Sequence, residues 1–203
     1  MAEKEYLDPE AVDDFGQEVI NYIKAWNIVR DMVLKIKEFE KKFSRRVDVL
    51  LLDEFVALYK LIDPEAKYVE MFKGYSENSR EFLTKLERII SKLTIVETFD
   101  SLIEYLLAAA YDLTAHDYLG DMTFKYLFWL VETAMISRGH GIVVFEDRLE
   151  LEAVIELHQK VIVYAKTNNS KNFALCKEFR QLVSMFKDKI EQFSHYDKER
   201  YSV

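Results

Sequence analysis

The chain has 203 residues, of which 50% are apolar and 32% are charged, and its formal net charge is −8. It contains only five Gly and two Pro, too few for the many tight turns of an all-β sandwich or a doubly wound α/β fold. The single Cys excludes an intrachain disulfide and a cysteine-based zinc site. The composition therefore predicts an all-α fold: a single domain over residues 1–203, built as a bundle of about seven or eight helices.

Residues 9–43 are predicted to form an unusually long first helix, opened by the Asp8-Pro9 pair. Apolar residues then recur at alternating steps of 4 and 3, the spacing of a coiled-coil seam. This seam consists of Phe15, Val19, Tyr22, Trp26, Val29, Val33 and Ile36. The helix would be about 50 Å long, which is more than a compact domain of this size readily covers. We expect the seam to be buried, either inside one antiparallel bundle or in an intermolecular coiled coil, with Gly16 as its weak point.

Further helical segments follow along the chain. They are expected over 47–62, 64–73, 76–93, 96–118, 122–137, 146–166 and 171–193. The segment over 122–137 is apolar nearly all round, which is typical of a central buried helix. No linker rich in Pro, Gly or Ser divides the chain, and the best position for a sub-boundary is 93–98.

Carboxylates and a histidine on the helices over 96–118 and 122–137 form one candidate site. Asp112 and His116 are four residues apart and share a helical face, and Glu132 could approach from the next helix. Such groups on facing helices of a bundle can hold a divalent metal. However, the Glu-x-x-His pair typical of di-metal bundles is missing, so the alternative is an ordinary i,i+4 pair on a solvated acidic face.

Two basic segments are candidate anion sites. The loop over 138–141 combines Arg138 and His140 with two glycines, whose backbone amides could approach an anion. The end of the first helix carries a cluster of four cations that could form a small phosphate-binding patch. The cluster consists of Lys41, Lys42, Arg45 and Arg46. The simpler alternatives are a tight interhelical turn for the loop and complementation of the helix dipole for the cluster.

The sequence contains no phosphate loop and no Gly-x-Ser-x-Gly nucleophile motif. Our leading interpretation is therefore a non-enzymatic helical interaction or assembly protein with no required cofactor. We expect it to bind itself as a homodimer, or else another protein, through one apolar face near the start of the first helix. The expected interface residues are Phe15, Val19, Ile23 and Trp26.

Two alternative functions stay open at this point. One is an all-α enzyme or ligand-binding protein that uses the Asp112, His116 and Glu132 site, with a divalent metal as its cofactor. The other is weak nucleic-acid binding through a local basic patch. No stretch approaches the ~20 apolar residues of a membrane span, and the acidic N-terminus does not resemble a signal peptide. We therefore expect a soluble cytoplasmic protein that does not bind membranes.

Random-sequence duplex DNA should not bind tightly. Residues 1–100 carry a net charge of −5 and residues 101–203 a net charge of −3, so neither half can replace the counterions of the phosphate backbone. Fluorescence anisotropy with labelled random duplex at physiological salt is the measurement. Submicromolar binding would contradict this expectation.

Overall fold

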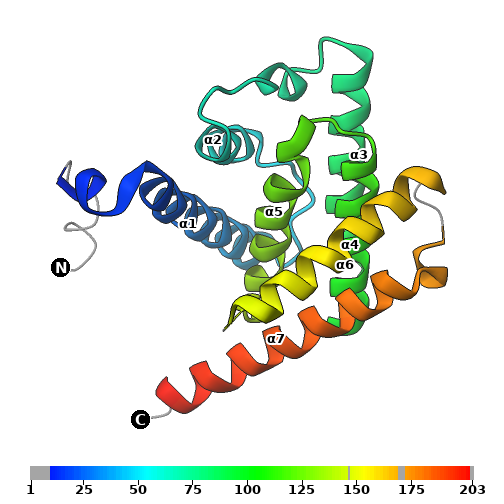
Figure 1. Cartoon of the computed structure of the whole chain (residues 1–203). Coiled ribbons are helices and arrows are strands. Elements are labelled where there is room, and N and C mark those ends of the chain that lie inside the picture. Colours follow the sequence, from blue (N-terminus) through cyan, green and yellow to red (C-terminus); the bar gives the residue numbers. More distant parts are fainter. Residues whose placement is uncertain (1–9, 146, 169–171, 202–203) are drawn as a thin grey trace.

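The computed structural model describes residues 10–145, 147–168 and 172–201, and all its regular elements are helices (Figure 1). The α-helices are α1 (Glu10–Phe43), α2 (Leu52–Ile62), α3 (Glu77–Leu93), α4 (Phe99–Ala115), α5 (Thr123–Ser137), α6 (Arg148–Thr167) and α7 (Lys177–Tyr201). Three short 3-10 helices join them: η2 (Val69–Phe72), η3 (Gly120–Met122) and η4 (Phe173–Leu175). The predicted all-α bundle with a long first helix is confirmed, and no strand occurs in the described ranges.

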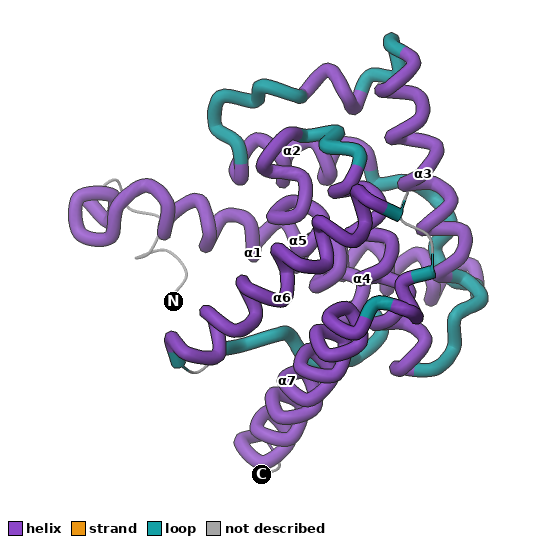
Figure 2. The backbone as a smooth tube through the Cα atoms, turned by 45° about the vertical axis from the view of Figure 1, so that its right-hand side comes forward, coloured by secondary structure: helices purple, strands orange, loops and turns teal. Residues whose placement is uncertain are grey.

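Helix α1 covers the predicted range but bends at Gly16. This residue has φ 77° and ψ 156°, a conformation outside the helical region that glycine adopts without a Cβ clash. The bend occurs at the position that the sequence marked as the weak point of the helix. Beyond it, the N-terminal end of α1 projects away from the other helices (Figures 1 and 2).

The buried side of α1 is rotated away from the N-terminal half of the predicted seam. The buried residues are Ile20, Ala25, Val29 and Met32. In contrast, Val19 is 45% exposed and Tyr22 is 57% exposed, because α2 and α5 pack against the neighbouring face. Within this single chain the seam is buried or half-buried only from Trp26 onward. The side chain of Phe15, the first member of the seam, lies outside the described residues.

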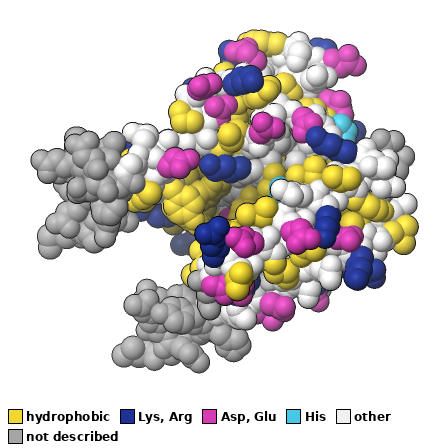
Figure 3. Space-filling view, viewed as in Figure 1, with side chains coloured by type: hydrophobic (Ala, Val, Ile, Leu, Met, Phe, Trp, Pro, Cys, Tyr) yellow, Lys and Arg dark blue, Asp and Glu magenta, His cyan; other side chains and the backbone are white. Residues whose placement is uncertain are grey.

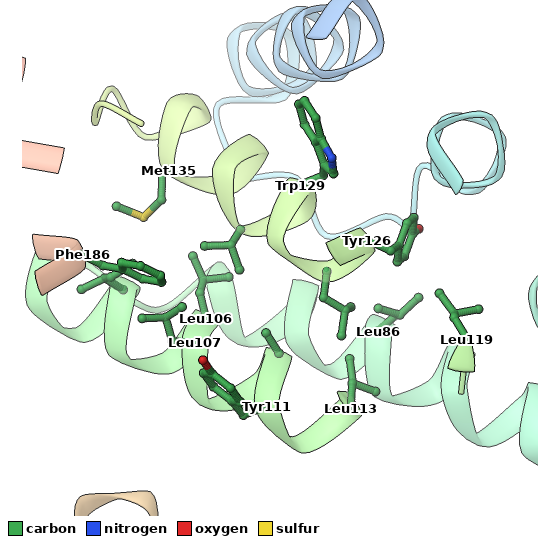
Figure 4. Close-up of a cluster of buried hydrophobic side chains, with 14 of the residues drawn as sticks. Leu86, Leu106, Leu107, Tyr111, Leu113, Leu119, Tyr126, Trp129, Met135 and Phe186 are labelled. Carbon is green, nitrogen blue, oxygen red and sulfur yellow. The ribbon is translucent and has the colours of Figure 1, made fainter. Parts of the chain in front are cut away.

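Helix α5 lies at the centre of the bundle, as its all-round apolar sequence predicts. It packs against α4 on one side and against α1 and α2 on the other. Figure 4 shows Trp129 pointing toward α1, while Leu106 and Leu107 of α4 lie on the opposite side. Helices α6 and α7 pair with each other and cover the far side of α4. The fold is therefore layered, with α1 and α2 outside α5, and α6 and α7 outside α4.

Three predicted helices differ clearly from the structure. The helix expected over 47–62 begins only at Leu52, and the one expected over 171–193 begins only at Lys177. Residues 64–73 form turns and η2 instead of an α-helix. The Asp63 carboxylate accepts hydrogen bonds from the Tyr59 hydroxyl at 2.6 Å and from the Lys67 amide at 3.1 Å, and this side-chain bonding stabilises a turn. At the other end of the chain, α7 continues to Tyr201 past the predicted end at 193.

Replacing Trp129 by Ala should destabilise the fold by about 3–5 kcal/mol. Trp129 is 7% exposed, and its ring centroid lies 4.9 Å from that of Trp26 and 5.1 Å from that of Tyr22. Denaturant titration measures the loss, with Leu149→Ala as the control because Leu149 is 77% exposed. A loss below about 1 kcal/mol for Trp129→Ala would show that these aromatic contacts contribute little to stability.

Candidate functional site

A wide hollow, which we call the Glu132 cleft, lies between α1, α5, α6 and the segment 142–145. Its volume is about 700 Å³, and most of its walls are aromatic or aliphatic. Apolar side chains also gather on the face of the molecule between α1 and α6 (Figure 3). The polar lining residues are Tyr22, Tyr111, Asp121, Lys125, Glu132 and His158. A cleft that is mainly apolar with a few polar groups is the usual form of a binding site.

Among the acidic and basic residues that line this cleft, Glu132 is the most buried. It is 4% exposed, and its Oε1 accepts a hydrogen bond from the Val143 amide at 3.2 Å. Its Oε2 has no hydrogen-bond partner among the described residues. Burial raises the pKa of Glu132 to about 8, although the Val143 hydrogen bond lowers it in part. The carboxyl group is therefore mostly neutral at pH 7 and can donate a hydrogen bond.

A tyrosine and a histidine meet at another wall of the Glu132 cleft. The hydroxyl of Tyr111 on α4 lies 3.0 Å from Nδ1 of His158 on α6. Burial raises the pKa of Tyr111 and lowers the pKa of His158, so both stay neutral, and the imidazole tautomer sets which of the two donates. This pair was not predicted from the sequence. The signal for it was the position of His158 between Val154 and Val161, which are both buried on the same face of α6.

The structure does not group Glu132 with Asp112 and His116. The latter two lie at the end of α4, where the Lys85 ammonium is 3.2 Å from Asp112 Oδ2 and 3.2 Å from His116 Nε2. This lysine supplies the positive charge that a metal would bring. Across the described ranges, no three His, Cys, Asp or Glu side chains are placed to hold a metal ion. The predicted divalent site is thus not assembled from these residues.

The two predicted anion sites meet at one end of the bundle. Arg46 Nη1 donates to the carbonyls of Thr94 at 3.1 Å and Val96 at 2.6 Å. Arg138 donates to the carbonyl of Leu93 and, at 3.5 Å, to that of Val96. Both guanidinium groups therefore bind the chain just after α3, where helix carbonyls lack intrahelical partners. We call this part of the molecule the basic end.

The other members of the two anion sites are placed differently. Lys41, Lys42 and Arg45 are exposed, and Arg45 forms an ion pair with Asp48. His140 is half-buried, and its ring centroid lies 4.8 Å from that of Phe99. Burial and the nearby Arg138 lower the pKa of His140, so its imidazole is neutral at pH 7. Of the six predicted anion-binding residues, only Arg46 and Arg138 share a binding partner that the structure shows.

A second hollow, which we call the α1 groove, adjoins the Glu132 cleft. Its volume is about 400 Å³. It is lined by Glu18, Val19, Asn21, Tyr22 and Ala25 of α1, by Leu61, Ile62 and Pro64 at the end of α2, and by Lys125 and Trp129 of α5. Among the predicted interface residues, Val19 is exposed on this wall, whereas Ile23 and Trp26 are half-buried.

Comparisons with protein-family models, with curated proteins and with solved structures found no match. Within the part of the chain that the structure describes, every helix is too short or too polar to cross a membrane. The Glu132 cleft, the α1 groove and the basic end are therefore the features on which a function can be based.

Replacing Glu132 by Gln should flatten the pH dependence of stability. The folded protein holds the Glu132 proton up to a pKa of about 8, whereas an unfolded glutamate loses it near 4.5. The folded state thus binds more protons between these values, and the free energy of unfolding falls as pH rises through this window. From about pH 5 to pH 8, the wild type should lose roughly 3 kcal/mol relative to Glu132→Gln.

Denaturant titrations of both proteins across this pH range measure the difference. Taking the difference between the two proteins cancels titration of groups that they share, including His140 and His158. Parallel profiles for the two proteins would mean that the Glu132 carboxyl is ionised in the folded state.

Proposed function

We propose that this chain is a self-associating helical interaction protein whose copies join through the N-terminal half of α1 and the α1 groove. The observation that carries the proposal is the exposure of Val19 and Tyr22, at 45% and 57%, on the part of α1 next to its projecting end. Adjacent exposed apolar side chains beside a hollow are typical of protein–protein interfaces. This surface includes Val19, which the sequence predicted as an interface residue.

The chain offers both halves of a two-fold contact. One half is the apolar stripe of α1, and the other is the wall formed by Leu61, Ile62 and Pro64 on the opposite side of the groove. In a dimer with two-fold symmetry, the stripe of each copy can cover the groove of the other, so both copies bury the same surface. Glu18 and Lys125, also in the groove lining, supply opposite charges that can pair across such an interface.

The aromatic cluster behind the groove supports a rigid binding surface. Tyr22 contacts Trp26 at 6.3 Å and Trp129 at 5.1 Å between ring centroids, which holds the exposed tyrosine in place. Aromatic side chains that are ordered before binding lose little conformational freedom when a partner covers them. The surface therefore needs no rearrangement to accept a second copy.

The substitution Val19→Asp should convert the dimer into a folded monomer. A carboxylate at this position would lose its water in the interface and add a second negative charge beside Glu18, whereas in the monomer it faces water. Light scattering coupled to size-exclusion chromatography measures the mass, and circular dichroism checks that the fold is kept. Leu34→Asp is the matched control, because Leu34 is 54% exposed on the same helix and lines neither the cleft nor the groove.

The expected result is a dimer for the wild type and for Leu34→Asp, and a monomer for Val19→Asp. A wild type that remains monomeric at high concentration would overturn the proposal. So would equal dissociation of the two variants, because the interface would then not be specific to this part of α1.

A further inference from the structure

An apolar cavity of about 110 Å³ lies within the bundle and shares no lining residue with the Glu132 cleft. Its walls come mainly from α1, α3, α4 and α5 and include Leu86, Leu106, Ala109, Leu113 and Leu127. Its hydroxyl groups bond to their own helix: Thr133 donates to the Trp129 carbonyl and Ser137 to the Ala134 carbonyl. Cavities with such walls exclude water and accept apolar ligands.

One end of this cavity is charged. The charged lining residues are Glu40, Arg46 and Arg138, so the lining carries one positive charge in excess. All three are half-buried, and the exposed Val49 lies in the same lining, which places the opening of the cavity at the basic end. The deeper walls, including Leu113 and Leu127, are buried.

The two arginines can accept a further partner. Both donate to the Val96 carbonyl. Each guanidinium has further N–H groups besides those that donate to backbone carbonyls. Burial, and secondly the charge of Arg46, lower the pKa of Arg138, so the two cations disfavour each other's charge. Glu40 offsets part of this repulsion, and its own carboxylate lies 3.7 Å from Lys37. A bound anion would relieve the remaining repulsion between Arg46 and Arg138.

We propose that this cavity binds a single-chain amphiphile with an anionic head, specifically a medium-chain carboxylate. An alkyl chain of about five carbons matches the cavity volume of about 110 Å³, and the carboxylate lies at the basic end on Arg46 and Arg138. Arginine suits a carboxylate because its planar donors match the two oxygens. The exposed Lys41, Lys42 and Arg45 nearby in the chain favour an anion locally, although the whole protein carries a charge of −8.

This ligand site is independent of the proposed dimer. The basic end lies beyond the C-terminal end of α1, whereas the α1 groove is lined by its N-terminal half. Loss of ligand binding and loss of self-association are therefore expected from different variants, and either proposal can fail alone.

The test is isothermal titration of the full chain with hexanoate, hexanol and hexyltrimethylammonium below their micelle concentrations. Hexanoate should bind at least about tenfold more tightly than the alcohol or the ammonium, since only it pairs with the arginines. Equal affinity for hexanoate and hexanol, or no binding of hexanoate, would overturn the proposal.

Two matched pairs of variants locate the site. Ala109→Leu fills the cavity and should weaken hexanoate binding at least about tenfold, whereas Ala108→Leu, at a neighbouring position outside the lining, should not. Arg46→Gln should weaken binding of hexanoate but not of hexanol, whereas Arg45→Gln should change neither. Arg46 also binds the end of α3, so circular dichroism must show that its variant is folded. If Arg46→Gln is not folded, the comparison of Ala109→Leu with Ala108→Leu decides. Equal ligand binding by these two variants would refute the site.

A lipid headgroup in a membrane could present the same chemistry as a free carboxylate. Sedimentation with phosphatidylglycerol vesicles separates the two sources. Binding of monomeric hexanoate without vesicle binding supports the proposal. Vesicle binding without hexanoate binding would overturn it in favour of a lipid surface.

Discussion

The apolar character of α5 on all its sides is the constraint on which the rest of the structure depends. A helix without a polar face is stable in water only when other helices surround it. Helix α4 covers one side of α5, while α1 and α2 cover the other. Because α4 is also largely apolar, it requires α6 and α7 on its own far side. The order of the layers therefore follows from the apolar character of α4 and α5.

This arrangement explains why the two ends of α1, which are not needed to cover α5, differ in their chemistry. Only its middle part, around Ala25, Val29 and Met32, is needed to cover α5. The N-terminal part extends past the bundle and exposes apolar side chains, which suits a protein partner. The C-terminal part leads into the basic end, where Arg46 and Arg138 stabilise the last carbonyls of α3 by charge-assisted hydrogen bonds.

The sequence predicted the helices well because their periodicity is local information. The range of α1, its weak point at Gly16 and the central position of α5 could all be predicted from spacing and composition. The spacing could not give the rotation of α1 about its axis, since the seam and the flanking residues are both apolar. That rotation is set by where α2 and α5 pack, and it leaves Val19 exposed.

The candidate sites were harder to predict because their members are distant in sequence. Arg46 and Arg138 each appeared in a separate basic segment, and only the tertiary fold brings both to the Val96 carbonyl. Likewise, Tyr111 and His158 come from α4 and α6. Glu132 was recognised, but its expected partners at the end of α4 are engaged with Lys85 instead. Side-chain spacing along one helix predicts which residues share a face of that helix. It does not predict which residues of other helices pack against that face.

Hydrogen–deuterium exchange of the full chain at low and high protein concentration shows directly whether copies meet through α1 and its groove. If they do, amide exchange slows with concentration at residues 17–26 and 61–63, and it stays constant in α3, which lies outside the groove. Exchange that is independent of concentration throughout residues 17–26 would contradict the proposed self-association.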